Sequence, residues 1–341
     1  MKLRVGLVGL GGAWESRYRT ALLALADRFD VQAVCTPVSV RAEQVARELG
    51  AMVIDGYRAM SVRSDIDAIL MLAPDWYGPL PILAACEAGK AIYCAAALDI
   101  DPERAIEVRQ KVDVSGVAFM AEFARRYAPA TLRLKELIVT RLGKPRLLFC
   151  HHRLKTVDVP KTIRRGLPHP LVTRDLIELV DWCSWVVGSR PISVIGANRK
   201  QSSDGKDDYR MLSLDFAAHA DSGVGPLAQI SCGQYLSPKW PEAVGFRPPA
   251  ELQVCCENGV AFVDLPSSLV WYDDAGRHLE SLEMDRPVGE QLLTQFHRAV
   301  TSLVRKTQDL DDAYAALQVV MAAQQSHDEG RRISLENPPQ A

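Results

Sequence analysis

The chain has 341 residues, which is more than one hydrophobic core usually serves, so two domains are expected. Apolar residues make up 48% of the chain and charged residues 24%, the balance of a soluble globular protein. The formal net charge of −2 offers no basic surface for nucleic acid. No apolar run approaches the ~20 residues that cross a bilayer, so no membrane contact is expected.

Eight cysteines are present, and none forms a C-x-x-C pair. Nearly all lie in apolar runs, where a free thiol behaves as a small hydrophobic group. The first residues, MKLRVGLVGLGG, read as a β-strand that leads into glycines, whereas a signal peptide would continue to a small-residue cleavage site. A reduced, cytoplasmic setting is therefore expected.

Strands and helices alternate in the first third of the chain. Residues 3–10, 31–36, 66–73 and 91–95 read as strands, and the segments between them have helical spacing. This alternation predicts a doubly wound parallel sheet of the Rossmann type. Continuous apolar strands such as AILMLA fit burial on both faces of such a sheet. We therefore assign residues 1–123 to an α/β domain of the Rossmann type.

From about residue 124 the pattern changes to long strands in succession. Helical segments at 129–143 and 173–188 precede most of these strands, and two helices close the chain. The sequences ENG and DDAG between strands are hairpin signals. The pattern predicts an α+β domain over residues 124–341 with a large, mostly antiparallel sheet. Apolar residues on both faces of its strands indicate that the outer face is covered, so a homodimer or homotetramer through this sheet is expected.

The segment VGLGGAW follows the first strand and opens the first helix. Gly9 and Gly11 match the first two glycines of G-x-G-x-x-G, which allow a tight turn and the approach of a pyrophosphate to the helix N-terminus. The third position of the motif holds Trp14, whose side chain either crowds the phosphate or fills the space in which the phosphate would bind. The alternative is a strand–helix turn without a ligand. The residues expected at a dinucleotide are Gly9, Leu10, Gly11, Gly12, Ala13 and Trp14.

The second strand ends at Thr36. An enzyme that uses NAD usually has a carboxylate there, which binds the ribose diol. A carboxylate would repel the 2′-phosphate of NADP, whereas threonine would not, and Arg41 lies five residues further on. The sequence thus predicts NADP rather than NAD, if any dinucleotide binds. The equal alternative is that Arg41 is a solvated charge in the first turn of a helix.

Together these segments resemble the Gfo/Idh/MocA family of NAD(P)-dependent oxidoreductases, which act mostly on sugars, inositols and related polyols. The similarity runs nearly end to end and includes LAPDWYGPLPILAACEAGKAIYC (72–94), EFARRYAPATLRLKELIVTRLGKPR (122–146) and LIELVDWCSWVVGSRPISV (176–194). The resemblance implies a nicotinamide cofactor and a small polar substrate. It also implies cofactor contacts at Ala73, Pro74, Ala95 and Ala96.

The positions that carry catalysis in this family hold other residues here. In this family the strand that corresponds to AIYC (91–94) usually ends in Glu-Lys-Pro, and the lysine touches both nicotinamide and substrate. In this chain residues 95–97 are all alanine. The substrate helix usually carries Asp, His and Asp, and these places hold Arg174, Glu178 and Asp181. A positioned acid or base contributes roughly 10²–10⁴-fold. Alcohol oxidation by the usual route is therefore expected to be nearly abolished.

Glu178 lies one helical turn from both Arg174 and Asp181, so the three share a helix face. Glu178 and Asp181 are the candidates for a replacement acid–base pair, and Arg174 is a candidate substrate contact. The alternative is an intrahelical Arg–Glu pair that only supports the helix. Further expected substrate contacts are His151, His169 and Tyr235. A metal site is not expected, because the histidines lack ligand spacing that fits one.

Two functions remain open. The first is an oxidoreductase with a relocated proton carrier, acting on a sugar-like or polyol substrate. The second is a catalytically inactive relative that binds a dinucleotide, a sugar or a partner subunit. The inherited fold favours the oxidoreductase, and the altered site favours the inactive relative. Because the residues of the site determine the function, the fold does not decide between the two.

Overall fold

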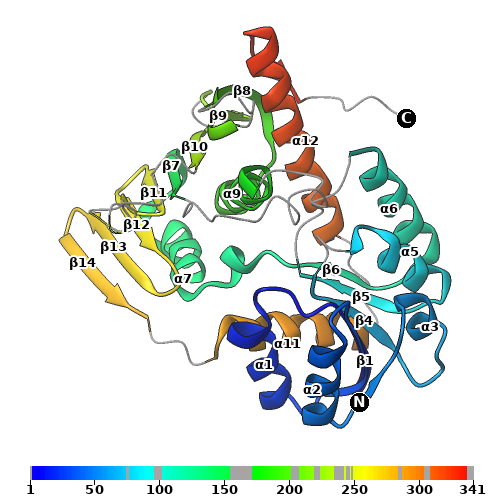
Figure 1. Cartoon of the computed structure of the whole chain (residues 1–341). Helices are drawn as coiled ribbons and strands as arrows, with labels where there is room; N and C mark the ends of the chain where they lie inside the picture. Colours follow the sequence, from blue (N-terminus) through cyan, green and yellow to red (C-terminus); the bar gives the residue numbers. More distant parts are fainter. Residues whose placement is uncertain are drawn as a thin grey trace. The chain divides into compact units, whose positions relative to one another are not determined.

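The computed structural model describes residues 2–73, 77–95, 102–153, 171–200, 207–218, 223–233, 242, 246, 249–282, 286–302 and 308–335. The chain forms two compact units (Figure 1). The first contains the residues up to Ala124 and also helix α11 (Val288–Thr301), and the second begins at Arg125. Helix α12 (Gln308–Glu329) contributes its residues up to Tyr314 to the first unit and those from Ala315 to the second.

The first unit contains a six-stranded parallel sheet with the strand order β3-β2-β1-β4-β5-β6. The predicted doubly wound sheet is thereby confirmed. The order reverses at β1, whose neighbours are β2 and β4, and the carboxyl ends of strands at such a point form the usual ligand crevice. The strands are β1 (Leu3–Val8), β2 (Phe29–Cys35), β3 (Met52–Val53), β4 (Ala68–Met71), β5 (Ala91–Cys94) and β6 (Phe119–Ala121).

Helices follow the strands of this sheet, as the alternating sequence predicts. In α2 the residues Ala42, Val45 and Ala46 form one buried stripe, and Gly50 ends the helix with a left-handed φ of 67°. The strands β4 and β5 are buried along their whole length, which explains their continuous apolar sequences. The helices are η1, a π-helix (Trp14–Tyr18), α1 (Arg19–Ala24), α2 (Ser39–Leu49), α3 (Tyr57–Ser61), α5 (Leu80–Glu87), α6 (Pro102–Ser115) and α11.

The second unit contains a nine-stranded sheet with the order β14-β13-β12-β11-β7-β10-β9-β8-β15. All neighbours are antiparallel except β7 and β10, so the predicted mostly antiparallel sheet is confirmed. Its strands are β7 (Pro145–Arg153), β8 (Pro191–Lys200), β9 (Asp207–Phe216), β10 (Leu227–Gly233), β11 (Leu252–Cys256), β12 (Val260–Asp264), β13 (Ser268–Asp273), β14 (Gly276–Ser281) and β15 (Ile333–Ser334).

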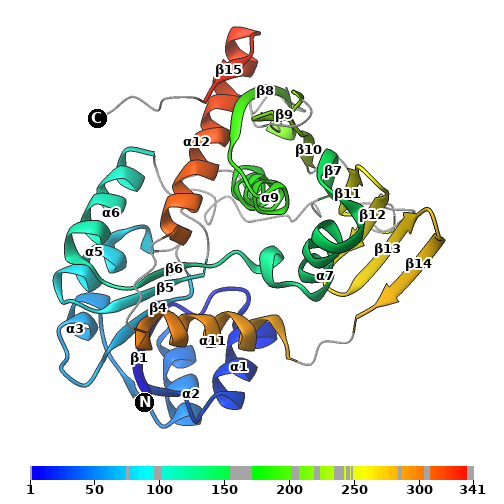
Figure 2. The same cartoon turned by 180° about the vertical axis from the view of Figure 1, so that it is seen from behind.

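Helices cover one face of this sheet (Figure 2). Helix α9 (Leu171–Val187) packs on β7, β9 and β10, and α7 (Pro129–Leu137) packs on β12 and β13. On β8, the N–H of Gly196 donates a 3.0 Å hydrogen bond to Ser326 of α12. Two short elements flank α7, the 3₁₀-helix η2 (Ala124–Tyr127) and the π-helix η3 (Ile138–Leu142). Because it is enclosed, α9 is apolar around most of its circumference.

The other face of the nine-stranded sheet carries a row of side chains in register across eight strands. No helix of the described part of the chain covers it (Figures 1 and 2). The row is Leu279, Val270, Phe262, Gln253, Phe149, Gln229, Ser213 and Ile195. At its two ends Leu279 is 66% exposed and Ile195 is 40% exposed. Each helix in the described ranges is too short or too polar to cross a lipid bilayer.

Candidate functional site

The chain leaves β1 through a glycine turn, residues 9–13, and enters η1. Gly9 and Gly11 have φ values of 71° and 53°, the left-handed region that glycine adopts without strain. A Cβ on Gly9 would lie 2.5 Å from the Cβ of Ala73, and one on Gly11 would overlap the carbonyl oxygen of Leu72. Glycine is therefore required at both places, because the turn passes directly against the segment that follows β4.

This turn presents free backbone donors at the beginning of a helix. Within the described residues, the N–H groups of Gly11, Gly12 and Ala13 donate no hydrogen bond. A Cβ on Gly12 would have no atom within 4 Å, so the space in front of the turn is open. Unpaired N–H groups at a helix N-terminus bind the oxygen atoms of phosphates. The residues present fit the pyrophosphate of a dinucleotide.

Trp14 lies in the core and not at the surface of this turn. Its side chain is 0% exposed, and its indole Nε1 has no hydrogen-bond partner among the described residues. The helix that it begins is a π-helix, in which the N–H of Tyr18 reaches back to the carbonyl of Ala13 at 3.4 Å. This wider turn gives room for an indole where the motif has a small residue. Only the backbone of Trp14 is available to the turn's open side.

The end of β2 carries no carboxylate. Thr36 follows Cys35 and is half-buried, and Arg41 lies in the first turn of α2. The guanidinium of Arg41 makes no hydrogen bond or ion pair with any residue that the structure describes. The Tyr77 hydroxyl lies 3.9 Å from the Cys35 sulfur, and burial together with this neighbour raises the pKa of Tyr77. Thr36 and Arg41 thus lie at the end of β2, and the described residues offer the arginine no partner.

Ala95 directly follows β5, and its N–H donates a 3.0 Å hydrogen bond to the carbonyl of Met71. Its methyl group can neither donate nor accept a proton. Pro74 and Ala96 lie outside the described residues, and so do His169 and Tyr235. Ala73 is placed against the glycine turn, as described above.

In the second unit a buried arginine lies between two carboxylates. The Arg125 side chain is 13% exposed; its Nη1 lies 2.8 Å from Oε2 of Glu251, and its Nε lies 3.6 Å from Oε2 of Glu178. The guanidinium also lies 5.4 Å from the ring centroid of Trp182. Within the described residues, Nε is buried and makes no hydrogen bond. The sequence left open an intrahelical pair between Glu178 and Arg174; in the structure the carboxylate of Glu178 lies beside Arg125.

His152 belongs to the same cluster. On β7 the buried Leu148 and Cys150 alternate with half-exposed residues, and Cys150 contacts Cys183 of α9, so His152 points to the α9 side. Burial and the positive charge of Arg125 lower the pKa of His152 from 6.5 to about 4. Its imidazole is therefore neutral at pH 7 and can accept a proton or a hydrogen bond.

His151, the sequence's candidate on this strand, points to the opposite face of the sheet. Its Nδ1 lies 2.6 Å from the Ser231 hydroxyl. Sequence reasoning singled out His151 and missed His152. The signal for His152 was the alternation itself, since Leu148 and Cys150 are the apolar residues in phase with it.

Asp181 forms a buried ion pair with Arg126. The two residues are 3% and 7% exposed, and Oδ2 of Asp181 lies 2.7 Å from Nε of Arg126, with a second contact between Oδ1 and Nη2. The pair joins η2 to α9 and occupies both carboxylate oxygens. Arg174 is half-buried on the same helix. In the described part of the chain no group of three or more metal-ligating side chains is placed to hold a metal ion.

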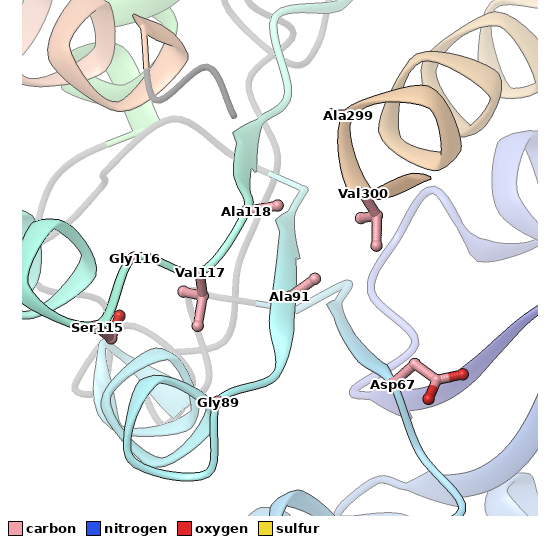
Figure 3. Close-up of a pocket in the computed structure, with 9 residues that line it drawn as sticks. All are labelled: Asp67, Gly89, Ala91, Ser115, Gly116, Val117, Ala118, Ala299 and Val300. Carbon is pink, nitrogen blue, oxygen red and sulfur yellow. The ribbon is translucent and has the colours of Figure 1, made fainter. Parts of the chain in front are cut away.

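A cavity of about 220 Å³ lies at the amino ends of β4, β5 and β6, at the other end of these strands from the glycine turn (Figure 3). Its one charged lining residue, Asp67, is paired with Arg4 at 2.6 Å. The lining residues are Asp67, Gly89, Ala91, Ser115, Gly116, Val117, Ala118, Ala299 and Val300. Five of these nine residues are alanine or valine, and none of the candidate site residues lines the cavity.

The chain is similar in sequence to known oxidoreductases. Residues 3–123 match the model of the Gfo/Idh/MocA family, described as an oxidoreductase family with an NAD-binding Rossmann fold. The chain is 27% identical over 198 residues to inositol 2-dehydrogenase 3 of Saccharopolyspora erythraea, covering 57% of this chain and 56% of that one. It is 28% identical over 206 residues to inositol 2-dehydrogenase of Corynebacterium glutamicum, covering 59% of each. The chain thus spans little more than half the length of these relatives.

Among solved structures, the chain is similar to aldose-aldose oxidoreductase from Caulobacter crescentus. The match has a TM-score of 0.83 and 16% identity, and it covers 98% of this chain and 100% of that one. At this identity the likeness concerns the fold, and it extends over both units.

Proposed function

We propose that this chain, whose residues 3–123 match the Gfo/Idh/MocA family, is an oxidoreductase of that family that binds a nicotinamide dinucleotide at the glycine turn and transfers hydride to or from a sugar-like or polyol substrate. The observation that carries the proposal is the turn itself. Its three free N–H groups, its open space at Gly12 and its position at the strand-order reversal all suit a pyrophosphate. The inositol 2-dehydrogenases among the relatives support a polyol substrate.

NADP is the proposed cofactor. Thr36 brings no negative charge to the end of β2, and the guanidinium of Arg41, which meets no partner among the described residues, supplies a positive one. Arginine binds phosphate through paired N–H donors, so it would hold the 2′-phosphate that distinguishes NADP from NAD. When bound, the nicotinamide supplies the hydride acceptor or donor.

Glu178 is the proposed proton carrier. In alcohol oxidation the C–H hydride leaves with its electron pair, and the hydroxyl proton must pass to a base. Glu178 is 28% exposed, and Arg125 orients its carboxylate from 3.6 Å. Neutral His152 stands in the same cluster and can accept a hydrogen bond from a substrate hydroxyl. We exclude Asp181 from this role, because Arg126 occupies both of its oxygens.

The experiment that tests cofactor binding is a titration with NADPH and NADH, followed by nicotinamide fluorescence. We expect NADPH to bind more tightly than NADH, and Arg41→Ala to remove the difference. Gly11→Ala should abolish binding of both cofactors, because its Cβ would overlap the backbone beside the turn. Equal affinities in the parent protein would contradict the assigned role of Arg41, and no binding of either cofactor would contradict the proposal.

The proton carrier is tested by turnover with polyols. Glu178→Gln should remove turnover and leave the cofactor Kd unchanged, because the amide cannot accept the proton. The matched control is Glu136→Gln on α7, whose carboxylate is 59% exposed and pairs only on the surface with Arg133. Turnover by Glu178→Gln equal to that of the control would remove Glu178 from the mechanism.

A catalytically inactive, ligand-binding relative is the second candidate function. The methyl group of Ala95 at the end of β5, together with the replaced family lysine and histidine, favours it. This alternative predicts dinucleotide binding without turnover on any polyol, even at high protein concentration. Saturable cofactor oxidation that depends on one substrate would rule it out.

A further inference from the structure

A buried carboxylate of the first unit has no role in the function proposed above. Glu122 follows β6 and is 3% exposed. It accepts hydrogen bonds from the hydroxyl of Tyr93 at 2.6 Å, from the hydroxyl of Tyr18 and from Nη1 of Arg17. Burial, with the charge of Glu122, raises the pKa of both tyrosines, which therefore remain donors. Burying a charge costs free energy unless hydrogen bonds compensate for it, so the place at which this chain buries Glu122 points to a role for that carboxylate.

Two of the three donors lie on η1, directly beside the glycine turn. The backbone N–H groups of Arg17 and Tyr18 both donate to the carbonyl of Ala13, at 2.9 and 3.4 Å. Ala13 is the last residue of the turn that presents free N–H groups. The side chains of Arg17 and Tyr18 thus anchor to Glu122, while their backbones hold Ala13. The third donor, Tyr93, comes from β5, and its ring packs edge-on against that of Tyr18 with the centroids 6.2 Å apart, a contact that phenylalanine would keep.

Helix α11 supports the same segment from another side. A Cβ on Gly289 would lie 2.6 Å from the carbonyl oxygen of Arg17, so α11 approaches the backbone of η1 as closely as glycine permits. A π-helix is rare in proteins; it occurs mostly as a single turn and is frequently found at functional sites. Here this wide turn is fixed by the carboxylate of Glu122 and by close contact with α11.

We infer that Glu122 is a positioning residue for the dinucleotide: through Tyr18 and Arg17 it fixes η1, and thereby aims the N–H groups of Gly11, Gly12 and Ala13 at the pyrophosphate. The inference rests on the proposed dinucleotide binding. Glu122 does not touch the cofactor in this scheme. Removing its link to η1 should loosen the turn, even where the rest of the sheet stays folded.

The chain offers a matched pair of variants, Tyr18→Phe and Tyr93→Phe. Each removes one buried hydroxyl that donates to Oε2 of Glu122, but only Tyr18 lies on η1. Two measurements are made on the full chain: hydrogen exchange of the amides of Arg17, Tyr18 and Arg19 in the free protein, and the Kd for NADPH. A melting curve of each variant shows that it is folded.

We expect Tyr18→Phe to speed exchange at these amides and to raise the Kd for NADPH about tenfold, because the arrangement of the turn that binds the pyrophosphate is then less populated in the free protein. Tyr93→Phe should lower the melting temperature as well, but change both readouts less than twofold. Equal effects of the two variants would overturn the inference, since Glu122 would then be merely structural. If the parent protein binds no dinucleotide, the proposed function fails, and the exchange rates alone decide whether Glu122 fixes the turn.

Glu122→Gln is the second variant. The amide keeps one oxygen acceptor but loses the charge that holds Arg17. The same two readouts should move in the direction of Tyr18→Phe. An unchanged Kd together with unchanged exchange in a folded Glu122→Gln protein would also overturn the inference.

Discussion

Neighbouring histidines on β7 acquire different environments because successive side chains of a strand point to opposite faces. His151 bonds to Ser231 on the face that no described helix covers. His152 turns toward α9 and Arg125, where its pKa falls to about 4. Adjacent residues thus have different environments: His151 makes a partly buried polar contact, and His152 is a neutral imidazole in the candidate substrate cluster.

The pKa of His152 makes a prediction about stability. In the unfolded chain the imidazole takes up its proton near pH 6.5, but in the fold only near pH 4, so the unfolded state binds more protons between these values. The free energy of unfolding should therefore fall as the pH drops from about 6.5 to 4. The loss from this group is at most about 3 kcal/mol, from the ~2.5-unit difference.

The variant His152→Gln checks this. Urea denaturation at pH 7, 6, 5 and 4 should show a shallower loss of stability in the variant than in the parent. Burial and Arg153 lower the pKa of His151 in the same direction, so His151→Gln serves as the comparison. Identical pH slopes for the parent and His152→Gln would contradict the assignment.

At the scale of elements, α9 is the helix whose placement matters most for the second unit. It carries Glu178 and the buried Asp181, and its C-terminal carbonyls need partners. Lys135 of α7 supplies them: its Nζ donates to the carbonyls of Trp185 at 3.0 Å and Val186 at 3.3 Å, and lies 5.1 Å from the Trp185 ring centroid. A cation is also favourable at the negative end of the helix dipole.

Lys135→Met should therefore destabilise the protein by about 1–3 kcal/mol, because it keeps the stem but leaves two carbonyls without their donor. The measurement is the free energy of unfolding in urea. The control is Lys111→Met on α6, where the ammonium makes only an exposed pair with Glu87 at 3.6 Å. Equal stability of the two variants would show that Lys135 does not cap α9.

At the scale of the whole molecule, the face of the nine-stranded sheet that no helix of the described ranges covers is the candidate surface for assembly. Its register row is rich in apolar side chains, with Phe262 packed edge-on against Tyr272 at 6.2 Å. Exposed apolar patches of this kind mark protein interfaces. A second copy of the chain, meeting the first through this face, is the proposed occupant.

Phe262→Glu tests this assembly by light scattering after size-exclusion chromatography. We expect a dimer or tetramer for the parent, and a smaller species for the variant, because a buried unpaired carboxylate is costly. Val139→Glu is the control: Val139 is 83% exposed on η3, so the same charge there should leave the mass unchanged. A monomeric parent at every concentration would contradict the proposal.

Most of the architecture was predictable from the sequence. Periodicity distinguished the two kinds of sheet because a strand buried on both faces and a strand buried on one face have different hydrophobic patterns. The glycine turn was also predictable, since left-handed φ angles at Gly9 and Gly11 exclude most other residues. The sequence did not predict that helix α11 belongs to the first unit. An amphipathic pattern indicates that one face of a helix is buried, but it does not identify the element against which that face packs.

The sequence by itself determined the two sheets and the family resemblance, because these depend on local pattern and residue identity. Only the tertiary structure decided which side chains meet. It paired Asp181 with Arg126, joined Glu178 to Arg125, placed His152 near the charge of Arg125, buried Trp14 and gathered Arg17, Tyr18 and Tyr93 around Glu122. Such contacts join residues up to 105 positions apart, and no local pattern encodes a distance of that kind.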